Sequence, residues 1–282
     1  MDKEYFLTKV LSYWSSLIRK VVFCVLRVGP IPTHIAVIMD GNRRYAKRKL
    51  LEEGAGHDAG AMALLNLIIY CYELGVKYIT AYAFAIDNFR RKPSEVQKIM
   101  DLLKECMTVL AKIAKHHPIR VNFAGNLELL NAELRDEARK LMGATAEYSK
   151  FVVTICVCYC CTDDIVHSVE KSCREKHYYH SYIRDSHDDD KDDADKDDER
   201  HMIKLVDIEK NMYMAVTPDP DILIRTGDEH RLSNFLQWQT CYSLLASLST
   251  DWPEIGVWHL VKVVLDFQQN YDYFVRKKLQ RL

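Results

Sequence analysis

Between Ile35 and Lys47 the chain reads IAVIMDGNRRYAK, an apolar run followed by an acid, a glycine, an amide and two arginines. The apolar run predicts a buried strand of a parallel sheet, with a polar loop at its carboxyl end. Open α/β sheets bind their ligands at that edge. Asp40 can hold a hard cation, Gly41 lets the backbone approach a ligand, and the basic residues after them can neutralise phosphate. The stretch therefore predicts a site for magnesium and a diphosphate.

Strand and helix patterns alternate from His34 to the end of the chain. Apolar runs predict strands, and apolar residues at helical spacing predict helices. The expected strands are 35–39, 78–84, 119–125, 151–159 and 222–225. The expected helices are 59–74, 93–115, 131–148, 163–173 and most of 254–278, and 234–245 forms a further element. This order predicts a single α/β domain with a central, mainly parallel sheet flanked by helices.

The charge of the chain is unevenly distributed. Ten of the 40 acidic residues and two of the 39 basic residues lie between Asp185 and Glu199, so the remainder is basic. A basic domain suits an anionic substrate, a membrane surface or nucleic acid. Aromatic residues are not interleaved with basic patches, and the glycine-rich nucleotide-binding loops are missing, so nucleic acid is not expected as a partner. Segment 174–200 has few aliphatic residues and is expected to be a mobile acidic insertion.

Segment 1–28 predicts an amphipathic helix. Its apolar stripe consists of Phe6, Val10, Trp14, Leu17, Val21 and Val25. The unbroken apolar run 21–26 is short and flanked by charges, which favours a helix lying on a membrane surface over one that spans it. Packing against the rest of the domain or against a partner is the alternative. The nine cysteines, with no cleavable signal peptide visible, predict reduced thiols and a cytosolic face.

Three polar clusters each follow an expected strand. They read DGNRR at 40–44, with a Gly-His pair at 56–57 downstream, DNFRR at 87–91 and RTGDEHRLSN at 225–234. Since the carboxyl ends of parallel strands lie at one edge of a sheet, we expect the clusters to converge. A solvated loop is the ordinary interpretation of any single cluster, but three of the same character favour a binding site.

These motifs closely resemble those of the cis-prenyltransferases, the family of undecaprenyl and dehydrodolichyl diphosphate synthases. Segments 34–47, 82–91 and 224–239 carry the resemblance, and 29–36 is most similar to the eukaryotic, plant-like branch. The resemblance implies that 34–282 is one catalytic domain that adds isopentenyl diphosphate units, with cis geometry, to an allylic diphosphate of the farnesyl type. The implied product is a long-chain polyprenyl diphosphate, dehydrodolichyl diphosphate, the implied cofactor is Mg²⁺, and a hydrophobic tunnel near 59–74 and 102–113 would hold the growing chain.

The resemblance also implies roles for individual residues. Asp40 would hold magnesium and, with Asn88 and Arg91, act in catalysis. The substrate-binding residues would be Gly41, Asn42, Arg43, Arg44 and His57 on the allylic side and Arg225, Arg231 and Ser233 on the isopentenyl side.

Four features depart from the family pattern. Ala85 stands in place of a serine, Asp228 in place of a glycine, and Ser243 where bacterial homodimeric enzymes have a metal-binding glutamate. The tail 271–282 lacks the family's Arg-x-Gly, which completes the active site across the dimer. A Nogo-B-receptor-like subunit would then supply it, at the cytosolic face of the endoplasmic reticulum membrane, with the cytosol as the alternative location. A partner-independent homodimer making shorter products, and a non-catalytic scaffold subunit, are the other interpretations.

Overall fold

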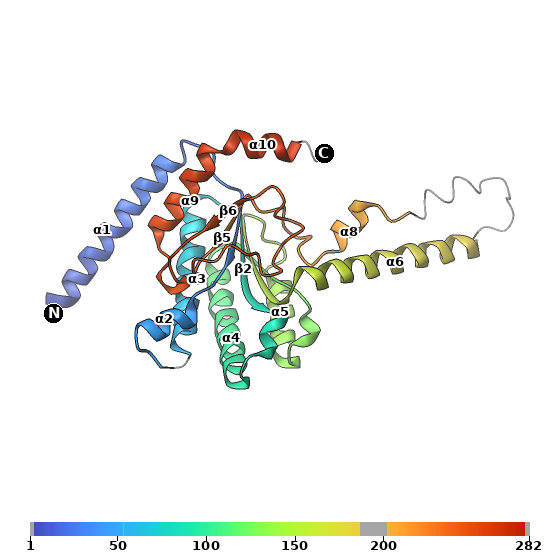
Figure 1. Cartoon of the computed structure of the whole chain (residues 1–282), viewed down its shortest axis with the longest axis horizontal. Coiled ribbons are helices and arrows are strands. Elements are labelled where there is room, and N and C mark those ends of the chain that lie inside the picture. The colour runs from blue at the N-terminus through green and yellow to red at the C-terminus, as the bar shows by residue number, and fades with distance from the viewer. Residues whose placement is uncertain (1–2, 53, 187–201, 280–282) are drawn as a thin grey trace.

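The computed structural model describes residues 3–52, 54–186 and 202–279, and these form an α/β fold around a six-stranded sheet (Figure 1). The strand order is β3–β4–β2–β1–β5–β6, and every neighbouring pair is parallel, as expected. The strands are β1 (His34–Ile38), β2 (Tyr78–Ala85), β3 (Ile119–Ala124), β4 (Phe151–Tyr159), β5 (Ile222–Arg225) and β6 (Leu244–Ser247).

Helices flank this sheet, and its central strands are largely buried and mainly apolar. They are α1 (Lys3–Leu26), α2 (Asn42–Arg48), α3 (Ala55–Leu74), α4 (Pro93–His116), α5 (Ala132–Ala144), α6 (Cys161–Ser186), α8 (Leu205–Asn211), α9 (Val257–Gln269) and α10 (Tyr271–Leu279). Short 3₁₀ turns span Ile86–Arg90, Leu127–Leu129 and Trp252–Glu254. Successive side chains of a strand point to opposite faces, so Val37 packs into the larger core with α3, α4 and α9, and Ala36 packs into a smaller one around Phe235.

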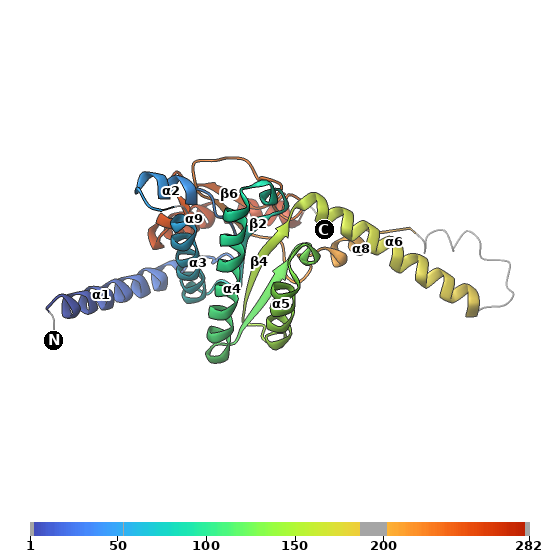
Figure 2. The same cartoon turned by 90° about the horizontal axis from the view of Figure 1, so that it is seen from below.

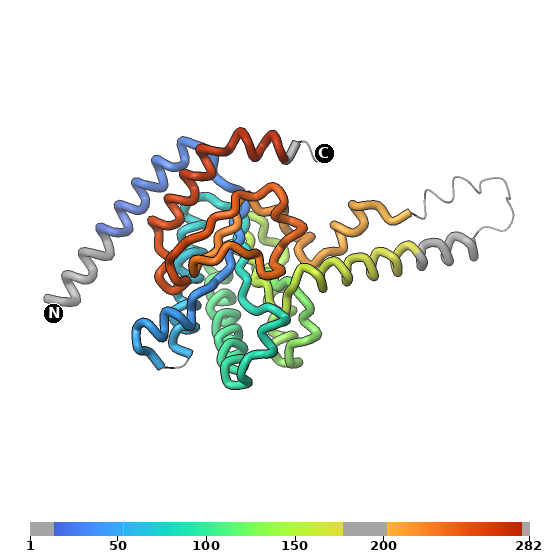
Figure 3. Tube along the Cα trace, viewed as in Figure 1, coloured from blue at the N-terminus to red at the C-terminus, as the bar shows by residue number. Residues whose placement is uncertain are grey.

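The N-terminal helix contacts the domain only near its end, among the residues whose side chains are described. Phe23 and Leu26 are buried, and Arg19 pairs with Glu73 of α3 at 2.6 Å. α1 and α9 come from opposite ends of the chain and lie side by side (Figure 3), where Gln268 donates to the Leu26 carbonyl at 2.7 Å. The rest of α1 extends away from the domain in both views (Figures 1 and 2).

The apolar stripe of α1 is uncovered over the residues whose side chains are described. Trp14, Leu17, Val21 and Val25 are all exposed, while Phe6 and Val10 lie where side chains are not described. Within the described part of the chain, no helix combines the length and the apolar character needed to cross a bilayer.

The prediction that the helix after β4 ends at Cys173 is wrong, because α6 continues to Ser186. Charged side chains of α6 pair with α8, a partner that lies beyond the acidic tract in the sequence. Lys176 lies 3.4 Å from Asp207, and Glu175 lies 3.3 Å from Lys210. Polar residues can therefore continue a helix here without an apolar stripe. The remainder of the expected insertion, 187–200, lies outside the described residues.

The sequence patterns also missed the short helices α2 and α8 and the edge strand β6. α2 begins at Asn42, within the first polar cluster, where a loop was expected; it buries no residue and so carries no apolar periodicity. The element expected at 234–245 is a series of turns that leads into the edge strand β6.

Candidate active site

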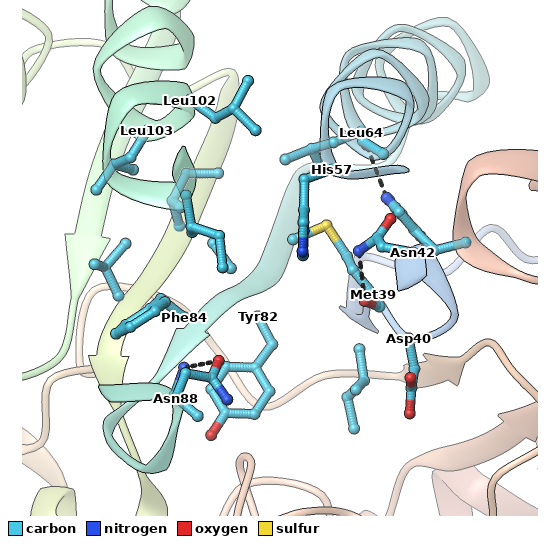
Figure 4. Close-up of a pocket in the computed structure, with 18 of the residues that line it drawn as sticks. Met39, Asp40, Asn42, His57, Leu64, Tyr82, Phe84, Asn88, Leu102 and Leu103 are labelled. Carbon is cyan, nitrogen blue, oxygen red and sulfur yellow. Dashed lines mark hydrogen bonds between the residues drawn. The ribbon is translucent and has the colours of Figure 1, made fainter. Parts of the chain in front are cut away.

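The three polar clusters converge at the carboxyl edge of the sheet, as the parallel order requires. They line one end of a cavity of about 670 Å³. The polar residues of this cavity are Asp40, Asn42, Arg43, His57, Asp87, Asn88, Arg91, Arg225, Arg231, Ser233 and Asn234. Figure 4 shows Asp40, Asn42, His57 and Asn88 around this space, from the loop after β1, α2, α3 and the 3₁₀ turn Ile86–Arg90 respectively.

The other end of the same cavity is apolar. Its wall comes from α3, α4, β2 and β4, and consists of Ala61, Leu64, Phe84, Ile99, Met100, Leu102, Leu103, Cys106, Ile155 and Val157. In Figure 4, Leu64 of α3 lies across the cavity from Leu102 and Leu103 of α4. The apolar wall thus lies where the sequence placed the tunnel.

A second, smaller cavity of about 270 Å³ adjoins the polar end. It is lined by Met39, Asp40, Gly41, Asn42, Arg43, Arg44, His57, Arg91, Glu229 and Arg231. All eleven site residues expected from the sequence line one of the two cavities, and six of them line both. Four arginines against one aspartate and one glutamate give the smaller cavity a positive charge, which suits a diphosphate.

Asp40 is held between two arginines at the end of β1. Its Oδ2 accepts a hydrogen bond from Arg225 at 2.7 Å, and its Oδ1 lies 3.5 Å from Arg44. Thr226 donates from Oγ1 to the Asp40 carbonyl at 2.6 Å and accepts from the Asp40 N–H at 3.1 Å. The carboxylate is 34% exposed and faces both cavities. It is therefore rigidly placed and still accessible to a ligand.

Arg225 is a buried cation beside Asp40. Its side chain is 8% exposed, and it donates to Ser233 Oγ at 2.7 Å and to the Arg231 carbonyl. Its Nε is buried without a hydrogen-bond partner among the described residues. Arg225 thus ties the third cluster to the first, and its charge is only partly satisfied by the protein.

The turn after β1 requires glycine. Gly41 has φ 107°, and a Cβ there would lie 2.5 Å from Oδ1 of Asp251. A side chain would clash as well as strain the backbone. The tight turn lets Asn42 start α2 at the cavity wall, where its Nδ2 donates to the Met39 carbonyl at 3.3 Å (Figure 4).

Glu95 joins three of the expected site residues, although it was not itself expected from the sequence. Its Oε1 accepts from Arg91 at 2.8 Å and lies 3.4 Å from His57 Nε2, while its Oε2 lies 3.9 Å from Arg43. The side chain is 12% exposed. Glu95 lies four residues after Arg91 at the start of α4, so helical spacing could have identified the pair.

Burial and the neighbouring charged partners have opposite effects on the pKa values of Glu95 and His57. Burial alone would raise the pKa of Glu95, but Arg91 and Arg43 outweigh it and lower that pKa, so Glu95 is ionised. For His57, burial lowers the pKa more than the contact with Glu95 raises it, and the ring is neutral at pH 7. A neutral ring can accept or donate one hydrogen bond to a ligand.

The second cluster presents Asn88 to the cavity. The side-chain Oδ1 of Asn88 accepts from the Ala85 N–H at 3.0 Å, which fixes the amide and leaves its NH₂ group available to a ligand (Figure 4). Ala85, the position expected to lack a hydroxyl, also lines the cavity.

The other departures from the family pattern lie outside both cavities. Asp228 has φ 57° and an exposed side chain, while its neighbour Glu229 lines the smaller cavity. Ser243 is buried and donates to the Pro220 carbonyl at 2.6 Å. Ser243 therefore anchors the loop before β5.

Comparisons with known proteins agree with this architecture. A family model described as "Putative undecaprenyl diphosphate synthase" matches residues 38–275. Dehydrodolichyl diphosphate synthase 6 of Arabidopsis thaliana is 50% identical over 268 residues, covering 93% of this chain and 91% of that protein. The dehydrodolichyl diphosphate synthase complex subunit DHDDS of Homo sapiens is 35% identical over 257 residues, covering 89% of this chain and 72% of that protein.

A solved structure shares the fold. Lavandulyl diphosphate synthase from Lavandula x intermedia, crystallised in complex with dimethylallyl diphosphate, aligns with a TM-score of 0.74 at 24% identity, over 84% of this chain and 95% of that one. The chain thus shares its fold with this structure, and the family model and the plant relative identify it as an enzyme that makes prenyl diphosphates. The chain belongs to the cis-prenyltransferase family, in its plant-like branch.

Proposed function

We propose that this enzyme condenses isopentenyl diphosphate with an allylic diphosphate of the farnesyl type, in cis geometry, to make dehydrodolichyl diphosphate. One observation carries the proposal: a single cavity joins a cationic end, built from three polar clusters, to an apolar end between α3 and α4. Such a cavity can hold a diphosphate and a hydrocarbon chain at once. The family and the plant relative support the same reaction.

Mg²⁺ fits the polar end with Asp40 as its protein ligand. Magnesium commonly takes one or two carboxylates together with substrate phosphate oxygens, and the Asp40 carboxylate is accessible from both cavities. The described side chains include no group of three or more His, Cys, Asp or Glu residues placed around one metal position. When bound, the ion would neutralise negative charge on the departing diphosphate.

The arginines of the site would bind and orient the two diphosphates. On the allylic side, Arg44 lines only the smaller cavity, and Arg43 and His57 line both cavities. On the isopentenyl side, Arg225 and Ser233 line only the larger cavity, and Arg231 lines both. Arg91, which is held by Glu95 and lines both cavities, and Asn88, which lines the larger one, would act between the two diphosphates. We assign these two residues to stabilising charge as the allylic diphosphate departs. Catalysis would rest on positioning and fixed charges.

The subunit and membrane contacts are also proposals. The printed name of the human relative describes it as a subunit of a complex, which supports a Nogo-B-receptor-like partner for this chain. The exposed apolar stripe of α1, including Trp14 and Val21, supports peripheral contact with the cytosolic face of the endoplasmic reticulum membrane. A homodimer in the cytosol is the competing outcome.

The test is a reconstituted elongation assay with labelled isopentenyl diphosphate, farnesyl diphosphate and Mg²⁺, with and without the partner subunit. We expect long-chain products whose formation requires or is strongly increased by the partner. Full activity of the isolated chain would support the homodimer, and no elongation under either condition would refute the proposed reaction. Sedimentation with phospholipid vesicles, comparing the wild type with Val21→Asp, tests the membrane contact.

A further inference from the structure

Asp251 is a buried carboxylate to which the proposed function gives no role. It is 6% exposed and precedes the 3₁₀ turn Trp252–Glu254. Both of its oxygens face arginines of α2: Oδ2 lies 3.0 Å from Arg48 Nη2, and Oδ1 lies 3.6 Å from Arg44 Nε. A buried carboxylate is stabilised by such cationic partners, and here one of the partners lines the smaller cavity.

The backbone on each side of Asp251 is fixed to the site. The Trp252 N–H donates to the Asp40 carbonyl at 2.9 Å, and the Gly227 N–H donates to the Thr250 carbonyl at 2.8 Å. The segment therefore bridges the ends of β1 and β5, the two strands that carry Asp40 and Arg225. The position of Asp251 is therefore fixed by the same two strands.

Arg44 lies between two carboxylates. Its Nη2 is 3.5 Å from Asp40 Oδ1, and its Nε faces Asp251. The guanidinium rests directly on Gly227, where a Cβ would collide with Nη2. If Asp251 lost its charge, the remaining carboxylate beside Arg44 would be Asp40, so Arg44 would shift toward Asp40 and away from its position at the wall of the smaller cavity.

We propose that Asp251 is a positioning residue for the allylic diphosphate. It holds Arg44 at the wall of the smaller cavity and limits the pairing of Arg44 with Asp40, which keeps the Asp40 carboxylate available. This inference rests on the proposed assignment of that cavity to the allylic diphosphate. Arg48 serves as a second support, since it joins Asp251 to Glu254 on the surface.

The test replaces Asp251 by its uncharged isostere in the full chain with its partner. For Asp251→Asn we expect the KM for farnesyl diphosphate to rise about tenfold and the KM for isopentenyl diphosphate to change less than about twofold. The matched control is Glu254→Gln, which removes the other carboxylate on Arg48 but does not contact Arg44. It should leave both KM values unchanged. Equal KM values for Asp251→Asn and wild type would overturn the proposal.

A double mutant separates positioning from general stability. If Asp251 acts through Arg44, then adding Asp251→Asn to Arg44→Gln changes the farnesyl diphosphate KM no further, whereas additive effects would overturn the proposal. Should Asp251→Asn fail to fold, Asp251→Leu serves in its place, because both arginines are half exposed and can turn to water. The same KM pattern is expected.

Measuring the binding of farnesyl thiodiphosphate, an unreactive analogue, tests the positioning role of Asp251 separately from the proposed reaction. Weaker binding by Asp251→Asn than by the wild type supports the positioning role even if the wild type does not elongate. Unchanged binding with a normal wild-type activity refutes the positioning role and leaves the proposed reaction standing.

Discussion

The polar end and the apolar end of the main cavity are built in different ways. At the polar end, side chains are fixed by directional contacts between residues that are distant in the sequence, such as Asp40 with Arg225 and Glu95 with His57. At the apolar end, Leu64 and Leu103 present hydrocarbon surface without directional partners. The contrast indicates that the diphosphates are held in one position while the growing chain is only enclosed. Changes at the two ends should therefore have different consequences.

The largest effect is expected at the polar end. Asp40→Asn should lower kcat by about 10³-fold, because it removes the proposed magnesium carboxylate and the counter-ion of the buried Arg225. The measurement is incorporation of labelled isopentenyl diphosphate at saturating Mg²⁺. Circular dichroism establishes that the variant is folded. Near wild-type turnover would refute the metal assignment.

A smaller loss is expected from Glu95→Gln. Glu95 holds Arg91 and His57 through bonds to a charged oxygen, and losing such bonds costs about 1.5–3 kcal/mol, or about tenfold to a hundredfold in kcat/KM. Asp58→Asn is the matched control, since Asp58 follows His57 on α3 and pairs with Lys98 outside both cavities. The two variants should differ clearly in steady-state kinetics. Similar rates for both would show that Glu95 has no part in positioning.

The apolar end should respond in product length more than in rate. Leu103→Ala enlarges the cavity, so we expect an altered chain-length distribution, with the KM for each diphosphate within about twofold of wild type. Stability should fall by about 2 kcal/mol, the low end for a buried leucine, because the side chain already borders a cavity. Chromatography of the products and thermal denaturation measure the two effects. A large rise in either KM would contradict the conclusion that the apolar end does not take part in binding the diphosphates.

The smallest effect is expected from Asp228→Gly. A left-handed φ of 57° strains a residue with a side chain, so glycine should raise stability by up to about 1 kcal/mol. The exposed side chain lines neither cavity, so the KM for isopentenyl diphosphate should stay the same. A marked fall in that KM would instead show that Asp228 impairs the isopentenyl side.

The parallel sheet and the convergence of three clusters followed from the sequence, because apolar runs mark buried strands and parallel strands share a carboxyl edge. β4 and β5 have the expected bounds. α2 and the extension of α6 were missed, since α2 buries no residue and the extension begins with Glu175 and Lys176, which pair with α8. These elements depend on tertiary contacts that leave no periodic signal.

The site residues also divide into those that the sequence predicts and those that depend on tertiary contacts. The expected arginines and Asp40 lie in motifs, whereas the contact of Asp251 with Arg44 depends on how the segment after β6 docks against β1. No local spacing connects positions 44 and 251. Glu95 is intermediate, because its i, i+4 relation to Arg91 is visible in the sequence but its contact with His57 is not.

The pairing of β1 with β5 has a consequence for synthesis on the ribosome. Asp40 emerges early, but Arg225, which neutralises it, and Trp252, which bonds its carbonyl, emerge after most of the chain. Domains generally fold as units as the chain is completed. A nascent or prematurely terminated chain would therefore present Asp40 without its counter-ion, and the catalytic centre would assemble only in nearly full-length enzyme. Truncated products of translation should consequently have no prenyltransferase activity.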